Sequence, residues 1–316
     1  MTRFIITTFL CFGILCSAQG MEGAAAELKK VDTPKPASQK TRVVMLGTGT
    51  PVPDPARAGP SVAVIYGGQS YVFDLGAGTV RNAVIASQKL GIEELFPTRI
   101  KHLFFTHIHS DHTADLSELV QTLWFREQPN IQLYGPKEFQ TIVDGLRLMV
   151  SPDVEARMKS IQPVKRKERS FIDVHVIRPG LVFDQNGVKI SAFLVDHGDL
   201  VPSYGYKIVT PDKTIVLSGD TTYNENVIEQ AKGADILLHE VMSEEGLSRL
   251  SEGWQKYHHA YHSTSGQVAK VASMAKPKLL VLYHVLFFGA SENSVLQEVK
   301  SRYSGTVVLA KDLDEF

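Results

Sequence analysis

The sequence predicts one α/β domain in which two β-sheets lie against each other and helices cover their outer faces. Short apolar runs typical of strands alternate with helical patterns, in segments too short for two separate domains. The 316 residues are 43% hydrophobic and 21% charged, which is a globular composition and excludes disorder or coiled coil as the main state. Both cysteines, Cys11 and Cys16, lie near the amino end, so the domain must be stable without disulfides.

The amino end is predicted to be a secretory signal peptide over residues 1–20. One positive charge, Arg3, precedes an apolar run over 4–16, and small residues follow at Ser17, Ala18 and Gly20. An uncleaved anchor is the alternative, although the run is short for a membrane span. Residues 21–40, rich in Ala, Lys and Pro, are predicted to be a flexible linker before a folded domain over 41–316. The mature protein is therefore expected to be secreted or periplasmic and free of the membrane.

The elements of the domain follow from local patterns. Strands are predicted where apolar runs lie between turn residues, over 42–46, 62–66, 71–74, 100–106, 182–183, 188–194, 206–209, 214–217, 236–238 and 279–283. Turn sequences at Gly67-Gly68, Asn186-Gly187 and 211–213 predict that three pairs of these strands are hairpins. Helices are predicted where apolar residues recur at helical spacing, over 79–90, 116–124 and 264–275. The last of these begins with a capping box, Thr264 with Gln267.

The charge balance excludes a global attraction to polyanions. The chain has 33 Lys and Arg residues against 34 Asp and Glu residues, a formal net charge of -1. A chain this balanced has no overall field that draws it to nucleic acid or acidic lipid. Any binding of a polyanion must therefore come from a local site.

One loop carries four metal-ligand side chains within six residues: His107, His109, Asp111 and His112. A buried strand is predicted to end at Thr106 and a helix to begin near His112, so the loop between them is tightly turned. Neutral imidazoles and carboxylates are the ligands that Zn²⁺ uses when no thiolate is available. Four such groups exceed what one tetrahedral ion takes from one loop while keeping a water, so two adjacent ions are the simpler interpretation.

Further ligand-type residues stand where predicted core strands meet their loops. His197 follows the apolar run 193–195, Asp220 follows 215–219, and His284 follows 279–283. Functional residues are often found at such positions, on loops held by a rigid scaffold. Each residue alone would more often be a hydrogen-bonded, partly buried side chain. Together with the histidine-rich loop, they predict a metal centre.

The sequence resembles the metallo-β-lactamase superfamily, and within it the branch that holds ribonuclease Z and the metal-dependent arylsulfatases. The likeness extends from about residue 41 to 314. It is carried by the histidine-rich loop and by short motifs, which are Leu46-Gly47-Thr48-Gly49-Thr50-Pro51, Phe73-Asp74-Leu75-Gly76, Ser218-Gly219-Asp220-Thr221, His239-Glu240 and His262-Ser263-Thr264. The resemblance implies a four-layer αββα sandwich and a single hydrolase domain.

The resemblance also implies a site for two Zn²⁺ ions, with other divalent metals as alternatives. Seven residues would be the ligands: His107, His109 and His197 for one ion, Asp111, His112 and His284 for the other, and Asp220 between them. A water shared by two such ions loses its proton near neutral pH, and the metal-bound hydroxide attacks the ester. Without a cysteine, the ligand set differs from that of β-lactamases that use a thiolate.

Three further residues receive roles by the resemblance. Asp111, already a ligand, is counted as catalytic together with His262 and Glu240. Glu240 would orient His262, which would act as a general acid or as a clamp on the anionic group of the substrate. Asp74 would fix a loop or a ligand imidazole. Without the resemblance, Asp74 and Glu240 could equally be turn caps or surface carboxylates.

The expected function is a secreted dinuclear zinc hydrolase that cleaves sulfate or phosphate esters in the manner of an arylsulfatase. The carboxyl-terminal third favours it, because Trp254, the stretch 257–261 and Phe287-Phe288 resemble the arylsulfatases and suit an apolar leaving group. Those aromatic residues could also be ordinary core. Two alternatives stay open, a ribonuclease Z-like phosphodiesterase or nuclease and a lactone or β-lactam hydrolase. A non-catalytic binding protein is disfavoured because every ligand position is filled.

The expected partner is a small anionic ester rather than nucleic acid. The arm by which long-arm ribonuclease Z enzymes grip tRNA has no room in the three-residue turn at 211–213. The basic residues Lys165, Arg166, Lys167 and Arg169 are expected to be a solvated face. Arg57 and Arg126 are candidate contacts for a sulfate or phosphate group. The resemblance makes a homodimer an expected state, by analogy with relatives.

Overall fold

The computed structural model describes residues 40–126, 128–160 and 172–316, which belong to one compact unit. The predicted signal peptide, the predicted linker up to residue 39 and the basic residues at 165–169 lie outside the described residues. Within the described part of the chain, no helix is both long and apolar enough to cross a bilayer.

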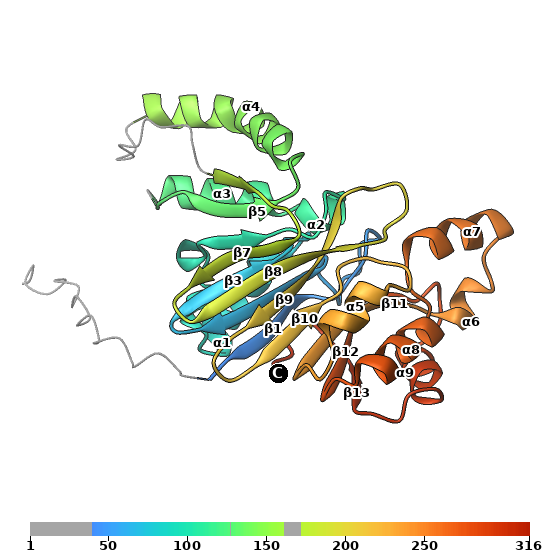
Figure 1. The fold of residues 1–316 in the computed structure, drawn as a ribbon. Coiled ribbons are helices and arrows are strands. Elements are labelled where there is room, and N and C mark those ends of the chain that lie inside the picture. Colours follow the sequence, from blue (N-terminus) through green and yellow to red (C-terminus); the bar gives the residue numbers. More distant parts are fainter. Residues whose placement is uncertain (1–39, 127, 161–171) are drawn as a thin grey trace, which may run out of the picture. The chain divides into compact units, whose positions relative to one another are not determined.

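The first sheet has six strands in the order β1-β2-β3-β4-β5-β6. Figure 1 labels three of them, β1, β3 and β5. They are β1 (Arg42–Gly47), β2 (Ser61–Tyr66), β3 (Gln69–Phe73), β4 (His102–Phe104), β5 (Ile131–Gly135) and β6 (Ile172–Val176). The first three pair antiparallel, and β3 to β6 run parallel. The hairpin predicted at Gly67-Gly68 is confirmed, and both glycines have the positive φ that a two-residue turn requires.

The second sheet has seven strands in the order β13-β12-β11-β10-β9-β8-β7. They are β7 (Gly180–Gln185), β8 (Val188–Val195), β9 (Ser203–Val209), β10 (Thr214–Leu217), β11 (Ile236–Met242), β12 (Leu279–Leu286) and β13 (Val307–Leu309). Strands β7 to β10 pair antiparallel, which confirms the hairpins predicted at Asn186-Gly187 and at 211–213. Strands β10 to β13 run parallel.

The helices join these strands. They are α1 (Thr79–Lys89), α2 (Ser110–Thr113), α3 (Leu116–Phe125), α4 (Phe139–Lys159), α5 (Glu225–Gln230), α6 (Glu244–Leu247), α7 (Glu252–Tyr261), α8 (Ser265–Ala275) and α9 (Glu292–Lys300), with short 3₁₀ turns η1 (Glu93–Leu95) and η2 (Pro97–Arg99). The capping box predicted for the helix at 264–275 is confirmed at the start of α8. In contrast, α7 has no buried residue.

Three layers of buried apolar side chains hold the elements together. Successive residues of a strand point to opposite faces, so Val43 and Met45 of β1 lie between the sheets while Val44 and Leu46 pack toward α1, α3 and α4. A third layer packs α5, α8 and α9 on the outer face of the second sheet. Helix, sheet, sheet and helix therefore form four layers, which confirms the predicted αββα sandwich.

Several predicted strands have different limits in the structure. The strand expected over 182–183 is the longer β7, the one over 206–209 begins at Ser203 in β9, and the one over 236–238 continues to Met242 in β11. Two further differences involve the ligand-type residues. The strand expected over 100–106 is β4, only His102–Phe104, because the amide of Thr106 donates to Asp74 Oδ1 and the chain enters the histidine-rich loop. The strand expected over 279–283 continues to Leu286 as β12. Its pairing with β11 shifts register across His284, so this residue is a β-bulge rather than the first residue after the strand.

Candidate metal centre

The ligand-type residues converge at one end of both sheets. His107 and His109 lie in the loop after β4, and Asp111 and His112 lie in α2. The other three come from the second sheet: His197 follows β8, Asp220 follows β10, and His284 lies in β12. The bulge at His284, where φ is 45°, turns that side chain toward the cluster instead of the alternating face of the strand.

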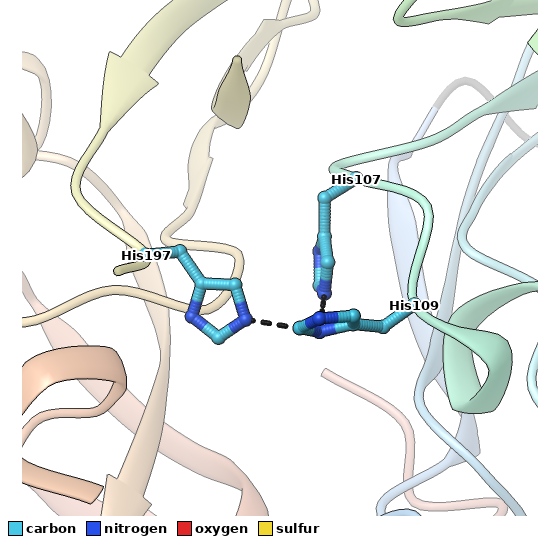
Figure 2. A group of neighbouring side chains, drawn as sticks. All are labelled: His107, His109 and His197. Atoms are coloured by element: carbon cyan, nitrogen blue, oxygen red, sulfur yellow. Dashed lines mark hydrogen bonds between the residues drawn. The ribbon is translucent and has the colours of Figure 1, made fainter. Parts of the chain in front are cut away.

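His107, His109 and His197 form a first group, in which the rings converge from the loop and from the end of β8 (Figure 2). His109 Nδ1 lies 3.1 Å from His107 Nε2 and 3.1 Å from His197 Nε2. One nitrogen from each ring lies within 4.8 Å of the others, which is the spacing that a shared ion needs. The structure thus brings together the three residues predicted for one ion.

Asp111, His112 and His284 form a second group with the same spacing. Asp111 Oδ2 lies 3.5 Å from His112 Nε2 and 3.8 Å from His284 Nε2. Asp220 joins both groups, because its Oδ2 lies 2.9 Å from His284 Nε2 and 3.9 Å from His107 Nε2. The seven predicted ligands are therefore neighbours in space, and their role as ligands stays a prediction.

Two buried atoms of this cluster test whether a metal fits. His112 Nε2 and Asp220 Oδ1 have no hydrogen-bond partner, although both are shielded from water. Burying an unpaired polar atom, above all a carboxylate oxygen, is costly. A cation bound between the two groups would satisfy both atoms, and nitrogen and oxygen donors without thiolate suit Zn²⁺. The residues present therefore fit a metal.

The ring nitrogens that face away from the centre are held by other groups. Such contacts fix the tautomer and orientation of metal-binding imidazoles. The partners are Thr106 Oγ1 for His107 at 2.9 Å, Asp74 Oδ2 for His112 at 2.9 Å, Tyr261 O for His197 at 2.7 Å and Gly49 O for His284 at 2.7 Å. In all four rings the atom left facing the cluster is Nε2.

Asp74 connects the two parts of the histidine-rich loop. Its Oδ1 accepts the backbone amide of Thr106, and its Oδ2 accepts from Thr106 Oγ1 and contacts His112 Nδ1. The side chain is 3% exposed, and φ is 57°, a value that Asp and Asn adopt more readily than other residues. These contacts are those expected of a residue that fixes a ligand loop.

The protonation of the metal-free cluster follows from burial and from Asp220. Burial lowers the pKa of His107 well below its usual value and that of His197 to about 4, so both rings are neutral at pH 7. Burial opposes the charged form of His284, but Asp220 outweighs it and raises the pKa of His284 to about 9. A positively charged His284 ring lies beside Asp220, and binding of a metal ion by His284 would release its proton.

Glu240 and His262 lie beside the cluster, as expected. Glu240 of β11 is fully buried, and its Oε1 accepts from the backbone amides of Thr221 and Ser263. His262 Nδ1 lies 3.3 Å from Glu240 Oε1 and 3.9 Å from Asp220 Oδ2. His262 also meets the ligand spacing with His197 and Asp220, so its position suits either proton transfer or metal binding.

Comparison with known proteins agrees with this geometry. The family model described as "Beta-lactamase superfamily domain" matches residues 73–285. A protein named ribonuclease Z from Mycobacterium marinum is 30% identical over 277 residues, which cover 86% of this chain and 96% of that one. The chain belongs to the metallo-β-lactamase superfamily, in its ribonuclease Z branch.

Solved structures place this member of the superfamily among proteins of the same fold. Human short-form tRNase Z is 26% identical, with a TM-score of 0.59 over 87% of this chain and 98% of the human one. YhfI of Bacillus subtilis, a metallo-β-lactamase-fold protein, has a TM-score of 0.65 and is 20% identical. The match covers 88% of this chain and 99% of YhfI, and it shows the fold alone. The chain is thus a metal-dependent hydrolase, and these relatives agree better with the phosphodiesterase alternative than with the arylsulfatase-like interpretation.

A cavity of about 890 Å³ opens over the candidate metal centre of this hydrolase. His109, Asp111, Asp220, His262 and His284 line its polar side. The aromatic residues singled out in the sequence line much of the rest, namely Trp254 and Tyr257 of α7 with Phe287 and Phe288 after β12. His258, which belongs to the stretch 257–261 singled out in the sequence, forms a further part of the wall. The proline-rich loop at 49–55 also lines the cavity, a position that the sequence did not indicate.

The two arginines expected to hold an anion do not serve that purpose in the structure. Arg57 lines the cavity, but its guanidinium donates to Thr48 Oγ1, Ala310 O and Glu292 Oε1. Arg126 lies at the end of α3, in a separate hollow lined by residues such as Trp124 and Asp153. The candidate anion contact at Arg126 is therefore wrong, and Arg57 is already paired.

Asp74→Asn should weaken zinc binding about 10- to 100-fold, as loss of a group that orients a ligand imidazole does. The amide of Asn has only one oxygen, so it cannot replace both Asp74 oxygens in the contacts to Thr106 and His112. Asn tolerates the positive φ of residue 74, so the backbone should stay the same. Zinc affinity can be measured by competition with a chromophoric chelator. The matched control is Asp184→Asn in the β7–β8 hairpin, where the carboxylate pairs with Lys189. Unchanged affinity in Asp74→Asn would contradict the role of Asp74.

Proposed function

We propose that this protein is a dinuclear zinc phosphodiesterase, exported from the cell, that acts on small phosphodiesters. The observation that carries the proposal is the convergence of seven zinc-type ligands around the buried, partly unpaired carboxylate of Asp220. Membership of the ribonuclease Z branch supports phosphodiester chemistry, and the sequence of residues 1–20 supports export.

In the proposed mechanism, His107, His109 and His197 would hold one zinc ion, Asp111, His112 and His284 would hold the other, and Asp220 would be a ligand shared by the pair. When bound, zinc supplies Lewis-acid stabilisation of the phosphoryl oxygens and lowers the pKa of water. The ligand rings would be held in place by the contacts to their outer nitrogens described above. The reacting phosphate is thereby positioned at the polar side of the cavity.

His262 would complete the reaction by protonating the departing alcohol oxygen. His262 Nδ1 lies 3.3 Å from Glu240 Oε1, so Nε2 is the ring nitrogen left to face the substrate. Glu240 itself is anchored by two backbone amides, so it would hold the imidazole in one orientation.

The size and lining of the cavity favour a small ester over folded RNA. The connection between β9 and β10 spans only residues 210–213, so it carries no arm. Among the described residues that line the cavity, Arg57 is the one Lys or Arg, and it is paired within the protein. The human relative is described as a tRNase, however, which conflicts with the expectation that nucleic acid is not a partner; short RNA ends therefore belong in the test.

A second candidate function, hydrolysis of aryl sulfate or aryl phosphate esters, is favoured by one observation. Trp254, Tyr257, Phe287 and Phe288 give the cavity a largely aromatic wall next to His262. Such a wall stabilises a planar, apolar leaving group by stacking.

A substrate panel distinguishes these functions. The purified mature protein should contain about two zinc ions per chain and hydrolyse bis-p-nitrophenyl phosphate, and a chelator should abolish turnover because the ligand residues alone supply no nucleophile. The panel also holds p-nitrophenyl sulfate, p-nitrophenyl phosphate, a short RNA, a lactone and a cephalosporin. Turnover of the sulfate but of no diester would favour the second candidate. Opening of only the lactone or cephalosporin ring would contradict both.

His262→Ala should lower kcat by about 100-fold or more for a diester with an alkyl leaving group, which needs a proton donor. The loss should be smaller for p-nitrophenolate, a stable anion, and zinc content should not change. Both rates and zinc content can be measured on the same preparations. His259→Ala, an exposed histidine of α7 outside the cavity, is the matched control. Release of zinc from His262→Ala would instead identify His262 as a ligand.

Trp254→Ala should raise KM for bis-p-nitrophenyl phosphate about three- to tenfold with little change in kcat, because stacking on the ring is lost. Trp254 is 59% exposed, so the fold should tolerate its truncation. Steady-state kinetics of Trp254→Phe should show a smaller effect, and Phe96→Ala, an exposed aromatic residue outside the cavity, should show none. Equal KM values in all variants would remove the argument for an aromatic substrate group.

A further inference from the structure

The carboxyl-terminal segment at 310–316 returns to the first strand of the domain. Leu313 N donates to Met45 O at 2.7 Å, and Met45 N donates to Asp314 O at 3.0 Å. These bonds place Asp312 next to the loop at 48–58 that connects β1 to β2 and forms part of the cavity wall. Asp312 is therefore held by backbone pairing at a fixed position beside the site.

The carboxylate of Asp312 accepts four hydrogen bonds. Oδ1 accepts from Thr48 N at 3.0 Å and from Thr48 Oγ1 at 2.7 Å. Oδ2 accepts from Ala58 N at 2.7 Å and from Asn82 Nδ2 of α1 at 2.9 Å. Bonds to a charged acceptor are stronger than those between neutral groups. One side chain thus ties both ends of the loop to each other and to α1.

The position of Gly49 depends on this closure. Gly49 N donates to Ala58 O at 2.7 Å, so the two ends of the loop also pair directly. A Cβ at Gly49 would lie 2.7 Å from Ala58 O and 3.0 Å from Arg57 O, closer than side chains approach. The loop therefore closes tightly only with glycine at this position and with its two ends held together.

The carbonyl of Gly49 in turn sets the orientation of His284. His284 Nδ1 donates to Gly49 O at 2.7 Å, because a carbonyl oxygen can only accept. Nε2 of the same ring then faces Asp220 at 2.9 Å and Asp111 at 3.8 Å. The backbone of β12 bulges at His284, where φ is positive. The Gly49 carbonyl adds a second constraint on this ring and keeps Nε2 in the cluster.

We propose that Asp312 is a positioning residue for the metal site that contains His284. By tying Thr48 to Ala58, it holds the Gly49 carbonyl against His284 Nδ1 and so directs Nε2 to the ion. The inference rests on the proposed dinuclear function. It predicts an effect confined to one of the two ions, because the loop at 48–58 makes no hydrogen bond to His107, His109 or His197 within the described part of the chain.

The test is a zinc titration of the metal-free full-length protein against a chromophoric chelator, which resolves two binding steps. Asp312→Asn keeps the size of the side chain but replaces one carboxylate oxygen by an NH₂ group. This group faces hydrogen-bond donors of the loop and cannot accept from them. One binding step should weaken about 10- to 100-fold, as is typical when the support of a ligand is lost. The other step should stay within about twofold of its original affinity.

Asp314→Asn is the matched control, because the Asp314 carboxylate lies two residues away and accepts only from Lys311 N among the described contacts.

Unchanged zinc affinity at both binding steps of Asp312→Asn would overturn the inference. An equal loss at both steps together with a lower Tm would also overturn it, since that pattern is general loss of structure. If Asp312→Asn does not fold, Thr48→Val is the second variant; it removes one of the four bonds to Asp312 and also the bond from Arg57 to Thr48 Oγ1. The same binding step should weaken by a smaller factor, and unchanged steps there would overturn the inference. Fewer than two zinc ions on the unaltered protein would instead contradict the dinuclear site itself.

Discussion

The negative charge of Asp220, buried where the two sheets end, is the constraint on which the site depends. Its Oδ2 lies 2.9–3.9 Å from ring nitrogens of five histidines, which are His107, His112, His197, His262 and His284. Oδ1 has no partner, so the protein alone does not compensate this carboxylate fully. Without metal, protonated imidazoles supply part of the missing positive charge. Cations bound in the two groups would supply the rest, which explains why so many potential ligands are gathered in one place.

The fold holds this arrangement in place with groups far apart in the sequence. The predicted ligands stand after strands, in the short helix α2 or at a bulge, and the sandwich of two sheets brings these positions together. Backbone carbonyls of Gly49 and Tyr261 and the carboxylate of Asp74 then fix individual rings. The aromatic side of the cavity comes largely from α7, which has no buried residue and so contributes to the cavity wall rather than to the core.

The sequence predicted the parts of the site that are local. The loop from His107 to His112 is compact, and the apolar runs before His197 and Asp220 marked strand ends, so these positions could be inferred without coordinates. The roles of Gly49 and Asp312 could not, because they depend on pairings between residues more than 200 positions apart. The edge strand β6 was missed since most of its residues are exposed, and α4 because Pro152 interrupts its pattern. The bulge at His284 was missed because it depends on the register with β11.

Whether Asp220 lies between two metal ions can be measured by anomalous X-ray diffraction at the zinc absorption edge, on crystals of the zinc-loaded protein. We expect two anomalous peaks on either side of the Asp220 carboxylate, one bounded by His107, His109 and His197 and the other by Asp111, His112 and His284. A single peak, a peak bound by His262 in place of these residues, or peaks away from Asp220 would contradict this expectation.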